Sequence, residues 1–164
     1  MNSKKIIISF IVITFLLLTG GIYILSITAS SATITPSQNA KIMVNEKTFD
    51  WGQIPYNGDK ATKTFTIKNT GTDILKLSNV KTSCTCTKAQ VEIKGKLSPF
   101  FNMHSTSSWV GKILPGQEGK LTVIFDQAFH GPQGVGPIER LVSIETNDVQ
   151  NPKLEFSLKG VVVK

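Results

Sequence analysis

Residues 64–73 read Thr-Phe-Thr-Ile-Lys-Asn-Thr-Gly-Thr-Asp, and this stretch decides the fold. In its first half polar and apolar side chains alternate, which is the period of a β-strand with one face on a core and the other in water. Its second half holds the Asn, Gly, Thr and Asp residues that favour turns. A short strand that ends in a turn is therefore the predicted building unit of the domain.

The same pattern recurs along the rest of the chain. Further strands are predicted at residues 42–44, 49–54, 75–77, 121–125, 141–144, 154–158 and 161–163, with turn residues between them. No segment after residue 41 keeps the 3.6-residue period of an amphipathic helix over three turns. The sequence therefore predicts an all-β fold for residues 41–164, an antiparallel immunoglobulin-like sandwich of two sheets.

A hydrophobic segment precedes this domain. Residues 6–28 carry no charge, and Lys4 and Lys5 stand directly before them. As a helix these residues would be about 34 Å long, enough for a hydrocarbon core of about 30 Å. The next basic residue is Lys41, so the charge bias predicts a cytoplasmic N-terminus and an extracytoplasmic domain. We expect residues 1–28 to form a transmembrane signal anchor, which makes the protein single-pass in the cell membrane.

A cleaved signal peptide is the alternative for the same segment. Residues 6–18 would then be its apolar region, and cleavage would follow Ser30-Ser31-Ala32, after which the domain is secreted. The anchor is favoured because the apolar run is longer than that of most signal peptides. Residues 29–40 are small, polar and uncharged, which predicts a flexible linker ahead of the domain.

Composition and motifs exclude several functions. About 125 residues remain after the N-terminal segment and the linker, enough for one core but not for two domains. The formal net charge is +7, yet Arg140 is the only arginine and the lysines are scattered, so no nucleic-acid partner is expected. The chain has no Gly-x-Ser-x-Gly, no His-Glu-x-x-His and no glycine-rich phosphate loop. We therefore expect no enzymatic activity and assign no catalytic residue.

Cys84 and Cys86 offer the most informative chemistry in the sequence. In a strand, residues two apart point to the same face with their Cα atoms about 6.5 Å apart. That distance is near the upper limit for a disulfide, which would need a local turn to close. Three readings stay open: two buried cysteines that pack as small apolar groups, a disulfide, or a metal-binding or redox-active pair.

The metal reading needs further ligands. Two thiolates on one face suit Cu(I) or Zn(II), and each ion would take one or two more donors. The candidates are Met103, His104 and His130. On the other two readings the protein has no cofactor.

A stretch of 28 residues, 87–114, separates the cysteines from the turn at Pro115 and predicts a long loop. It carries Phe100, Phe101 and Trp109 among Ser, Thr and Asn residues, a composition typical of contact surfaces. These three aromatic residues are candidates for binding a partner. The alternative is that they fold back and cap the open end of the sandwich.

Five motifs carry a resemblance to a known family. They are Phe49-Asp50-Trp51-Gly52, residues 65–71, Ser83-Cys84-Thr85-Cys86-Thr87, Leu114-Pro115-Gly116 and Thr146-Asn147-Asp148. Over residues 41–162 the chain resembles a bacterial envelope family known only as domain of unknown function fifteen-seventy-three. That family is similar to the immunoglobulin-like modules of major sperm protein and of cilium-associated proteins. The chain departs from the family pattern at Trp51, at Thr85 and in its 28-residue stretch.

The resemblance implies an immunoglobulin-like sandwich with no established enzymatic activity. Together with the predicted export, it favours a non-enzymatic binding or scaffolding module of the bacterial cell envelope. Its partner would be an envelope protein or a cell-wall component, and the N-terminal helix would contact the membrane. The alternative is a soft-metal-binding or thiol-redox protein that uses Cys84 and Cys86.

Overall fold

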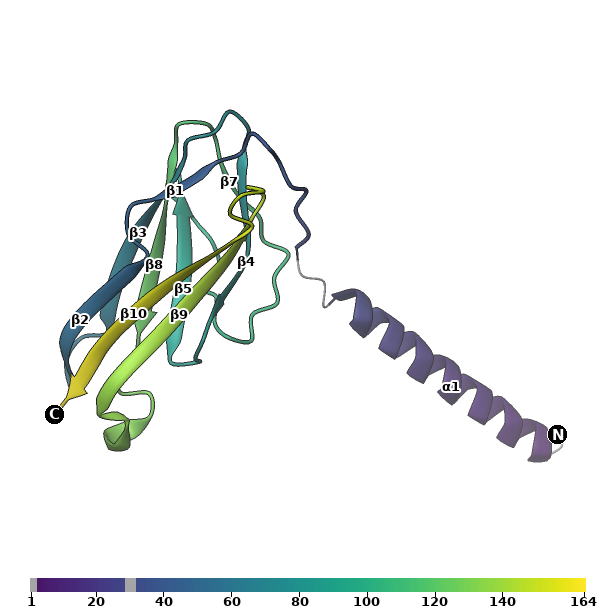
Figure 1. The fold of residues 1–164 in the computed structure, drawn as a ribbon. Helices are drawn as coiled ribbons and strands as arrows, with labels where there is room; N and C mark the ends of the chain where they lie inside the picture. The colour runs from purple at the N-terminus through teal and green to yellow at the C-terminus, as the bar shows by residue number, and fades with distance from the viewer. Residues whose placement is uncertain (1–2, 29–31) are drawn as a thin grey trace. The chain divides into compact units, whose positions relative to one another are not determined.

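The computed structural model describes residues 3–28 and 32–164 (Figure 1). The chain divides into two units, Met1–Ser31 and Ala32–Lys164. The first contains helix α1 (Ser3–Thr28). Within the described part of the chain, no helix combines the length and the apolar character that a membrane crossing requires. The predicted cleavage site lies mostly outside the described residues, because residues 30 and 31 are not among them.

The second unit is a sandwich of two five-stranded sheets. One sheet has the order β1 (Ile42–Val44), β3 (Ala61–Asn69), β8 (Glu118–Phe125), β5 (Thr87–Ile93) and β6 (Lys96–Leu97). The other has the order β2 (Thr48–Pro55), β10 (Lys153–Val163), β9 (Gly136–Thr146), β4 (Leu75–Thr82) and β7 (Gly111–Ile113). A 3-10 turn, η1 (Gly131–Gly134), lies between β8 and β9. The predicted immunoglobulin-like, two-sheet fold is confirmed.

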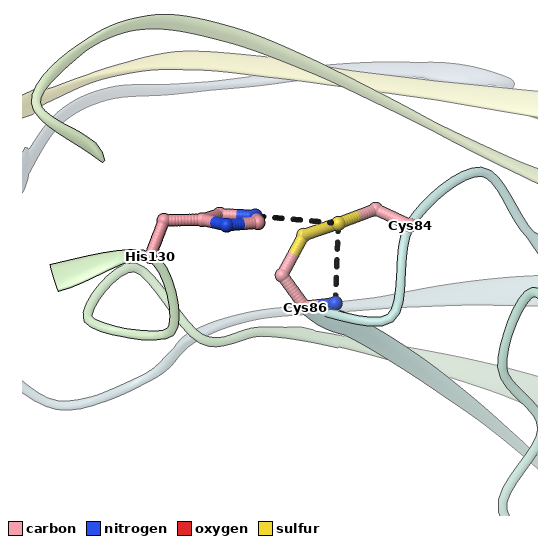
Figure 2. A group of neighbouring side chains, drawn as sticks. All are labelled: Cys84, Cys86 and His130. Atoms are coloured by element: carbon pink, nitrogen blue, oxygen red, sulfur yellow. Dashed lines mark hydrogen bonds between the residues drawn. A yellow bond between two sulfur atoms is a disulfide. The ribbon is translucent and has the colours of Figure 1, made fainter. Parts of the chain in front are cut away.

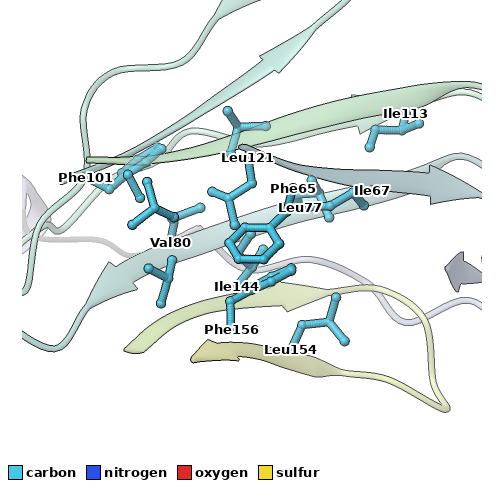
Figure 3. Packing of buried hydrophobic residues seen from close by; sticks show 14 of the residues in the cluster. Phe65, Ile67, Leu77, Val80, Phe101, Ile113, Leu121, Ile144, Leu154 and Phe156 are labelled. Atoms are coloured by element: carbon cyan, nitrogen blue, oxygen red, sulfur yellow. The ribbon is translucent and has the colours of Figure 1, made fainter. Parts of the chain in front are cut away.

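The core lies between the sheets and is built by the alternation seen in the sequence (Figure 3). Phe65 and Ile67 of β3 are buried, while Thr64 and Thr66 are exposed and Lys68 is half-buried. From the other sheet, the ring of Phe156 lies 4.8 Å from that of Phe65, centre to centre. Packing of aromatic rings across the two layers contributes beyond the apolar area that it removes from water.

Two features differ from the sequence expectation. The predicted loop at residues 87–114 is wrong, because it contains β5, β6 and β7, and β5 pairs with β8 along its whole length. In addition, β2 pairs with β10 in parallel, whereas the sequence predicted only antiparallel neighbours.

The predicted linker at residues 29–40 is shorter in the structure. Ala32 already donates its N–H to the carbonyl oxygen of Ser107, at 3.2 Å. Ser37 forms a parallel bridge with Asp148, and Ala40 is buried in the core. The part from residue 32 onward therefore belongs to the sandwich, since its backbone groups are satisfied by other segments of it.

The turn motifs of the sequence form hydrogen bonds with backbone groups of the same domain. The buried amide of Asn69 donates to the carbonyl oxygens of Asp73 and Ile113, at 2.8 and 2.9 Å, and accepts from the N–H of Gly71. The side-chain amide of Asn147 likewise accepts a hydrogen bond from the backbone N–H of Lys76 and donates one to the carbonyl oxygen of Ile74. Because each amide satisfies backbone groups that would otherwise be buried without partners, these motifs maintain the fold.

Asp148 is the charged member of this group. Its carboxylate is almost fully buried and accepts hydrogen bonds from the N–H groups of Ile42 and Gln150 and from the amide of Asn151. Burial alone would raise the pKa of Asp148, but these hydrogen bonds outweigh it and the pKa is lowered.

We predict that Asp148 makes stability depend on pH. Because its pKa is lowered in the folded state, its contribution is present above the unfolded value of about 3.9 and is lost as pH falls through the folded pKa. Asp148→Asn should lower the free energy of unfolding at neutral pH by about 1–3 kcal/mol. It should also flatten the loss of stability between about pH 5 and pH 2.

Urea unfolding at several pH values measures both effects. Asp59→Asn is the control, because Asp59 is an exposed carboxylate, and it should keep the wild-type pH dependence. Equal slopes for the wild type and Asp148→Asn would contradict the assignment.

Gly71 is required by close packing. A Cβ atom at this position would overlap the carbonyl oxygen of Asn39 and lie 2.6 Å from the backbone nitrogen of Lys41. We predict that Gly71→Ala lowers the free energy of unfolding by about 1–3 kcal/mol, since backbone must move to admit one methyl group. The neighbouring exposed control, Thr70→Ala, should stay within about 0.5 kcal/mol of the wild type in the same urea titration.

Candidate functional site

The two cysteines lie where the chain passes from β4 in one sheet to β5 in the other. The hydroxyl of Thr82 lies within hydrogen-bonding distance of the carbonyl oxygens of Cys84 and Thr87, at 2.9 and 3.0 Å. This turn brings the Cα atoms of Cys84 and Cys86 to 5.2 Å, closer than in a strand. The two residues form a disulfide, one of the three readings that the sequence left open.

The disulfide is partly enclosed by apolar side chains. Cys86 is buried in a small second cluster with Ile54, Phe125 and Val162, and Cys84 packs at the margin of that cluster. The indole ring of Trp51 stacks on Phe125, with the ring centres 5.9 Å apart. Cys84 is half-buried, so the disulfide can be reached from solvent through this residue.

His130 approaches the disulfide from the turn after β8 (Figure 2). Its Nε2 atom lies 3.8 Å from the Sγ atom of Cys84. The two sulfur atoms and one ring nitrogen of His130 all lie within 4.8 Å of one another. Among the described histidine, cysteine and acidic side chains, this is a group close enough to share a metal ion, and it contains His130 instead of His104.

The other predicted ligands lie in the segment after Phe101. His104 is exposed, and its backbone N–H donates to the side-chain oxygen of Asn102. Met103 is also exposed. The structure therefore brings only one of the three candidate ligands, His130, to the cysteine pair.

Arg140 lies on β9 next to Leu141, which contacts the residue before Cys84. Ser83 donates its backbone N–H to the carbonyl oxygen of Leu141, and the N–H of Leu141 donates to the side-chain oxygen of Ser83, each at 2.9 Å. The guanidinium carbon of Arg140 lies 5.1 Å from the ring centre of Phe125, and burial lowers the pKa of Arg140. Sequence reasoning treated this arginine only as evidence against nucleic-acid binding and missed its place beside the cysteines.

Polar atoms of Trp51, Arg140 and Asp126 also lie at this end of the sandwich. The buried Nε1 of Trp51 and Nε of Arg140 have no hydrogen-bond partner among the described residues. Asp126 donates its backbone N–H to the carbonyl oxygen of Cys86. The hydrogen bond from Lys60 lowers the pKa of Asp126, and their ion pair, at 2.7 Å, holds its carboxylate.

The aromatic residues of the 87–114 stretch divide into two groups. Phe101 is buried, its backbone exchanges hydrogen bonds with Ala89, and its ring centre lies 5.4 Å from that of Trp109. Trp109 is half-buried against the core. Both therefore cap the core, and the prediction that Phe101 is a partner contact is wrong because its side chain is inaccessible. Phe100 remains exposed, with 53% of its surface accessible.

A second candidate site is the groove between β6 and β7, which we call the β6–β7 groove. Its volume is about 280 Å³. It is lined by Ile93, Lys94, Lys96, Leu97, Trp109, Val110, Gly111 and Lys112. The groove therefore combines an apolar lining with three lysines, and Trp109 is the predicted contact residue that contributes to it.

The lysines of the β6–β7 groove lack countercharges. Lys94, Lys96 and Lys112 form no ion pair among the described residues. Lys112 also stands directly opposite Lys76 on β4. Two like charges at opposite positions of neighbouring strands repel each other, so an anionic group would be favoured here.

The comparisons with known proteins support the fold and the resemblance. The model of a family described as "Protein of unknown function (DUF1573)" matches residues 42–98. The resemblance is confirmed. The matched segment includes the Asn69 turn and both cysteines, and it is narrower than the 41–162 range expected from the motifs.

Solved structures that are similar to this one come from distant proteins. A protein of unknown function from Porphyromonas gingivalis W83 has a TM-score of 0.58 and 22% identity, over 79% of this chain and 50% of that chain. The chain thus spans about half the length of that protein. The PapD-like domain 7 of human CEP192 has a TM-score of 0.48 and 17% identity, over 80% of this chain and 91% of that chain.

A third solved structure, WR4, belongs to the MSP family of C. elegans. It has a TM-score of 0.41 and 15% identity, over 74% of this chain and 97% of that chain. No curated protein matches the chain.

Proposed function

We propose that the sandwich is a non-enzymatic binding module of the bacterial cell envelope. Its β6–β7 groove would take an extended, acidic segment of a partner protein. The observation that carries this proposal is the coincidence of free strand edges, an apolar lining and three unpaired lysines in one groove.

The strand edges provide the backbone groups for such a contact. β6 and β7 stand at the ends of their sheet orders, and among the described residues each pairs with one neighbour only. An exposed sheet edge binds an extended peptide by adding a strand, and side-chain pockets beside the edge select its sequence. Lysines beside the edge oppose pairing between two copies of this chain and favour an acidic segment.

The chemistry of the cysteines supports a location outside the cytoplasm. Disulfides persist in oxidising compartments and are rare in the cytosol, and Cys84 and Cys86 form one here. Lys4 and Lys5 at the start of helix α1, followed by an uncharged stretch of that helix, fit export of the domain. The proposal requires export, and it holds equally for an anchored and a cleaved N-terminal segment.

We predict that the C-terminus is accessible from outside the cytoplasmic membrane. A short epitope added after Lys164 should be digested by a protease applied to intact spheroplasts of an expressing bacterium. A cytoplasmic marker protein in the same cells should survive. An epitope that is digested only after lysis would contradict export.

Binding to the β6–β7 groove is tested with a synthetic probe. The probe is a peptide of alternating Glu and Val residues, and the matched control peptide carries Lys in place of Glu. We predict that the acidic peptide shifts the amide NMR signals of residues 93–97 and 109–113 in the full chain, whereas the basic peptide does not.

Charge reversal provides the decisive comparison. The triple variant Lys94→Glu, Lys96→Glu and Lys112→Glu should weaken binding of the acidic peptide by about tenfold or more, because each exposed charge contributes up to about 1 kcal/mol. A control variant with the same net charge carries Lys41→Glu, Lys47→Glu and Lys164→Glu, all exposed and outside the groove, and should bind like the wild type. Equal weakening in both variants, or no binding by the wild type, would contradict the proposal.

A further inference from the structure

The Cys84–Cys86 disulfide has no role in binding at the β6–β7 groove, yet it stands in a distinctive environment. One sulfur is half-buried and the other is buried, and an exposed imidazole points at the first (Figure 2). Thiolate and imidazole are the side chains that bind soft and borderline metal ions. The question is what these three groups do when the disulfide is opened.

We propose that reduction of the disulfide converts Cys84, Cys86 and His130 into a binding site for one Cu(I) ion. This goes beyond the proposed function, because it concerns a different part of the sandwich and a different class of ligand.

The backbone geometry fits such a site. Two thiolates on one metal ion, each about 2.3 Å from it, lie about 4 Å apart when they share it with a third ligand. A Cα separation of 5.2 Å between the cysteines allows this spacing after small side-chain rotations. His130 lies on the solvent side of the pair, with a ring nitrogen within 4.8 Å of both sulfur atoms. The imidazole can therefore complete a three-coordinate site without movement of either sheet.

The number and type of donors favour Cu(I) over Zn(II). Zinc is four-coordinate, so Zn(II) on these three donors would need water or a carboxylate as a fourth ligand, whereas Cu(I) is stable with three donors. The carboxylate of Asp126, whose backbone N–H donates to the carbonyl oxygen of Cys86, is paired with Lys60. The apolar side chains around Cys86 keep water from that side of the site. Soft thiolate ligands suit both Cu(I) and Zn(II), so the number of donors decides in favour of Cu(I).

Reduction of the disulfide and binding of Cu(I) each conserve atoms, electrons and charge. A dithiol donor attacks the disulfide, its own two thiols become a disulfide, and Cys84 and Cys86 gain two electrons and two protons. Binding of Cu(I) then releases the two thiol protons. The resulting dithiolate complex carries one net negative charge. The guanidinium of Arg140, which packs over Phe125 in the cluster that holds Cys86, supplies a positive charge at this end of the sandwich.

The test uses the full chain, reduced with a dithiol and kept free of oxygen, and Cu(I) supplied as a soluble complex with a competing chelator. We expect one Cu(I) per reduced chain and none on the untreated, disulfide-bonded chain. Cys84→Ser and Cys86→Ser should each abolish binding. His130→Ala should lower the affinity by about tenfold or more, because even the outer-shell partners of metal ligands contribute that much.

The second histidine is the matched control. His104→Ala removes the only other imidazole of the chain, which is exposed and outside the group, and should bind Cu(I) like the wild type. X-ray absorption of the loaded wild type should show sulfur and nitrogen in the copper shell, and His130→Ala should lose the nitrogen. Because His130 is exposed, this variant reports on the site even if a cysteine variant misfolds.

Several results would overturn the proposal. They are a reduced chain that binds no Cu(I), equal binding by the oxidised chain, equal effects of the two histidine substitutions, and preference for Zn(II) when both ions are present. None of these results would bear on the acidic peptide at the β6–β7 groove, so the two proposals fail independently.

Discussion

The passage of the chain from one sheet to the other, between Thr82 and Thr87, is the constraint on which both candidate sites depend. The buried hydroxyl of Thr82 lies between two carbonyl oxygens of this turn, and those contacts hold the turn tight. A tight turn brings the two cysteines within bonding distance and also sets the point where β5 begins. From that point β5 pairs with β8 through seven residues and delivers Ile93 and β6 to the groove at its other end. One crossing thus fixes the disulfide at the start of β5 and the groove at its end.

The sheets could be predicted from the sequence wherever a strand carries large apolar side chains on one face. In β3 the alternation of Phe65 and Ile67 with polar residues was sufficient to predict the strand. β5 was missed because its buried face begins with Thr87 and Ala89, which carry little apolar surface, and the charged Lys88 stands between them. Pairing with β8 on one side and with β6 on the other stabilises β5 as a strand, rather than the intrinsic strand preference of its residues. β6 and β7 are too short to show any period.

The candidate metal ligands illustrate what the sequence alone cannot provide. His104 is nearer to the cysteines along the chain than His130, yet His130 is the residue that reaches them. The reason is sheet order: β5 lies beside β8, with Thr87 opposite Phe125, so the turn after β8 ends next to Cys84. Arg140 comes to the same end of the sandwich from β9, where its guanidinium packs over Phe125. Such contacts depend on which strands are neighbours, and no local pattern encodes that.

The motifs singled out in the sequence fall into two physical classes. Asn69 and Asn147 place their side chains on backbone groups of their own domain, and Asp148 does so with a carboxylate. The polar side-chain atoms of these three residues are hydrogen-bonded inside the domain. Their presence therefore indicates the sandwich fold and does not indicate a function. The cysteines differ, since their side chains satisfy no backbone group outside their own turn and face an exposed imidazole. A two-residue disulfide adds little constraint to the unfolded chain, because the loop that it closes is so short. The disulfide between Cys84 and Cys86 therefore contributes little to the stability of the fold.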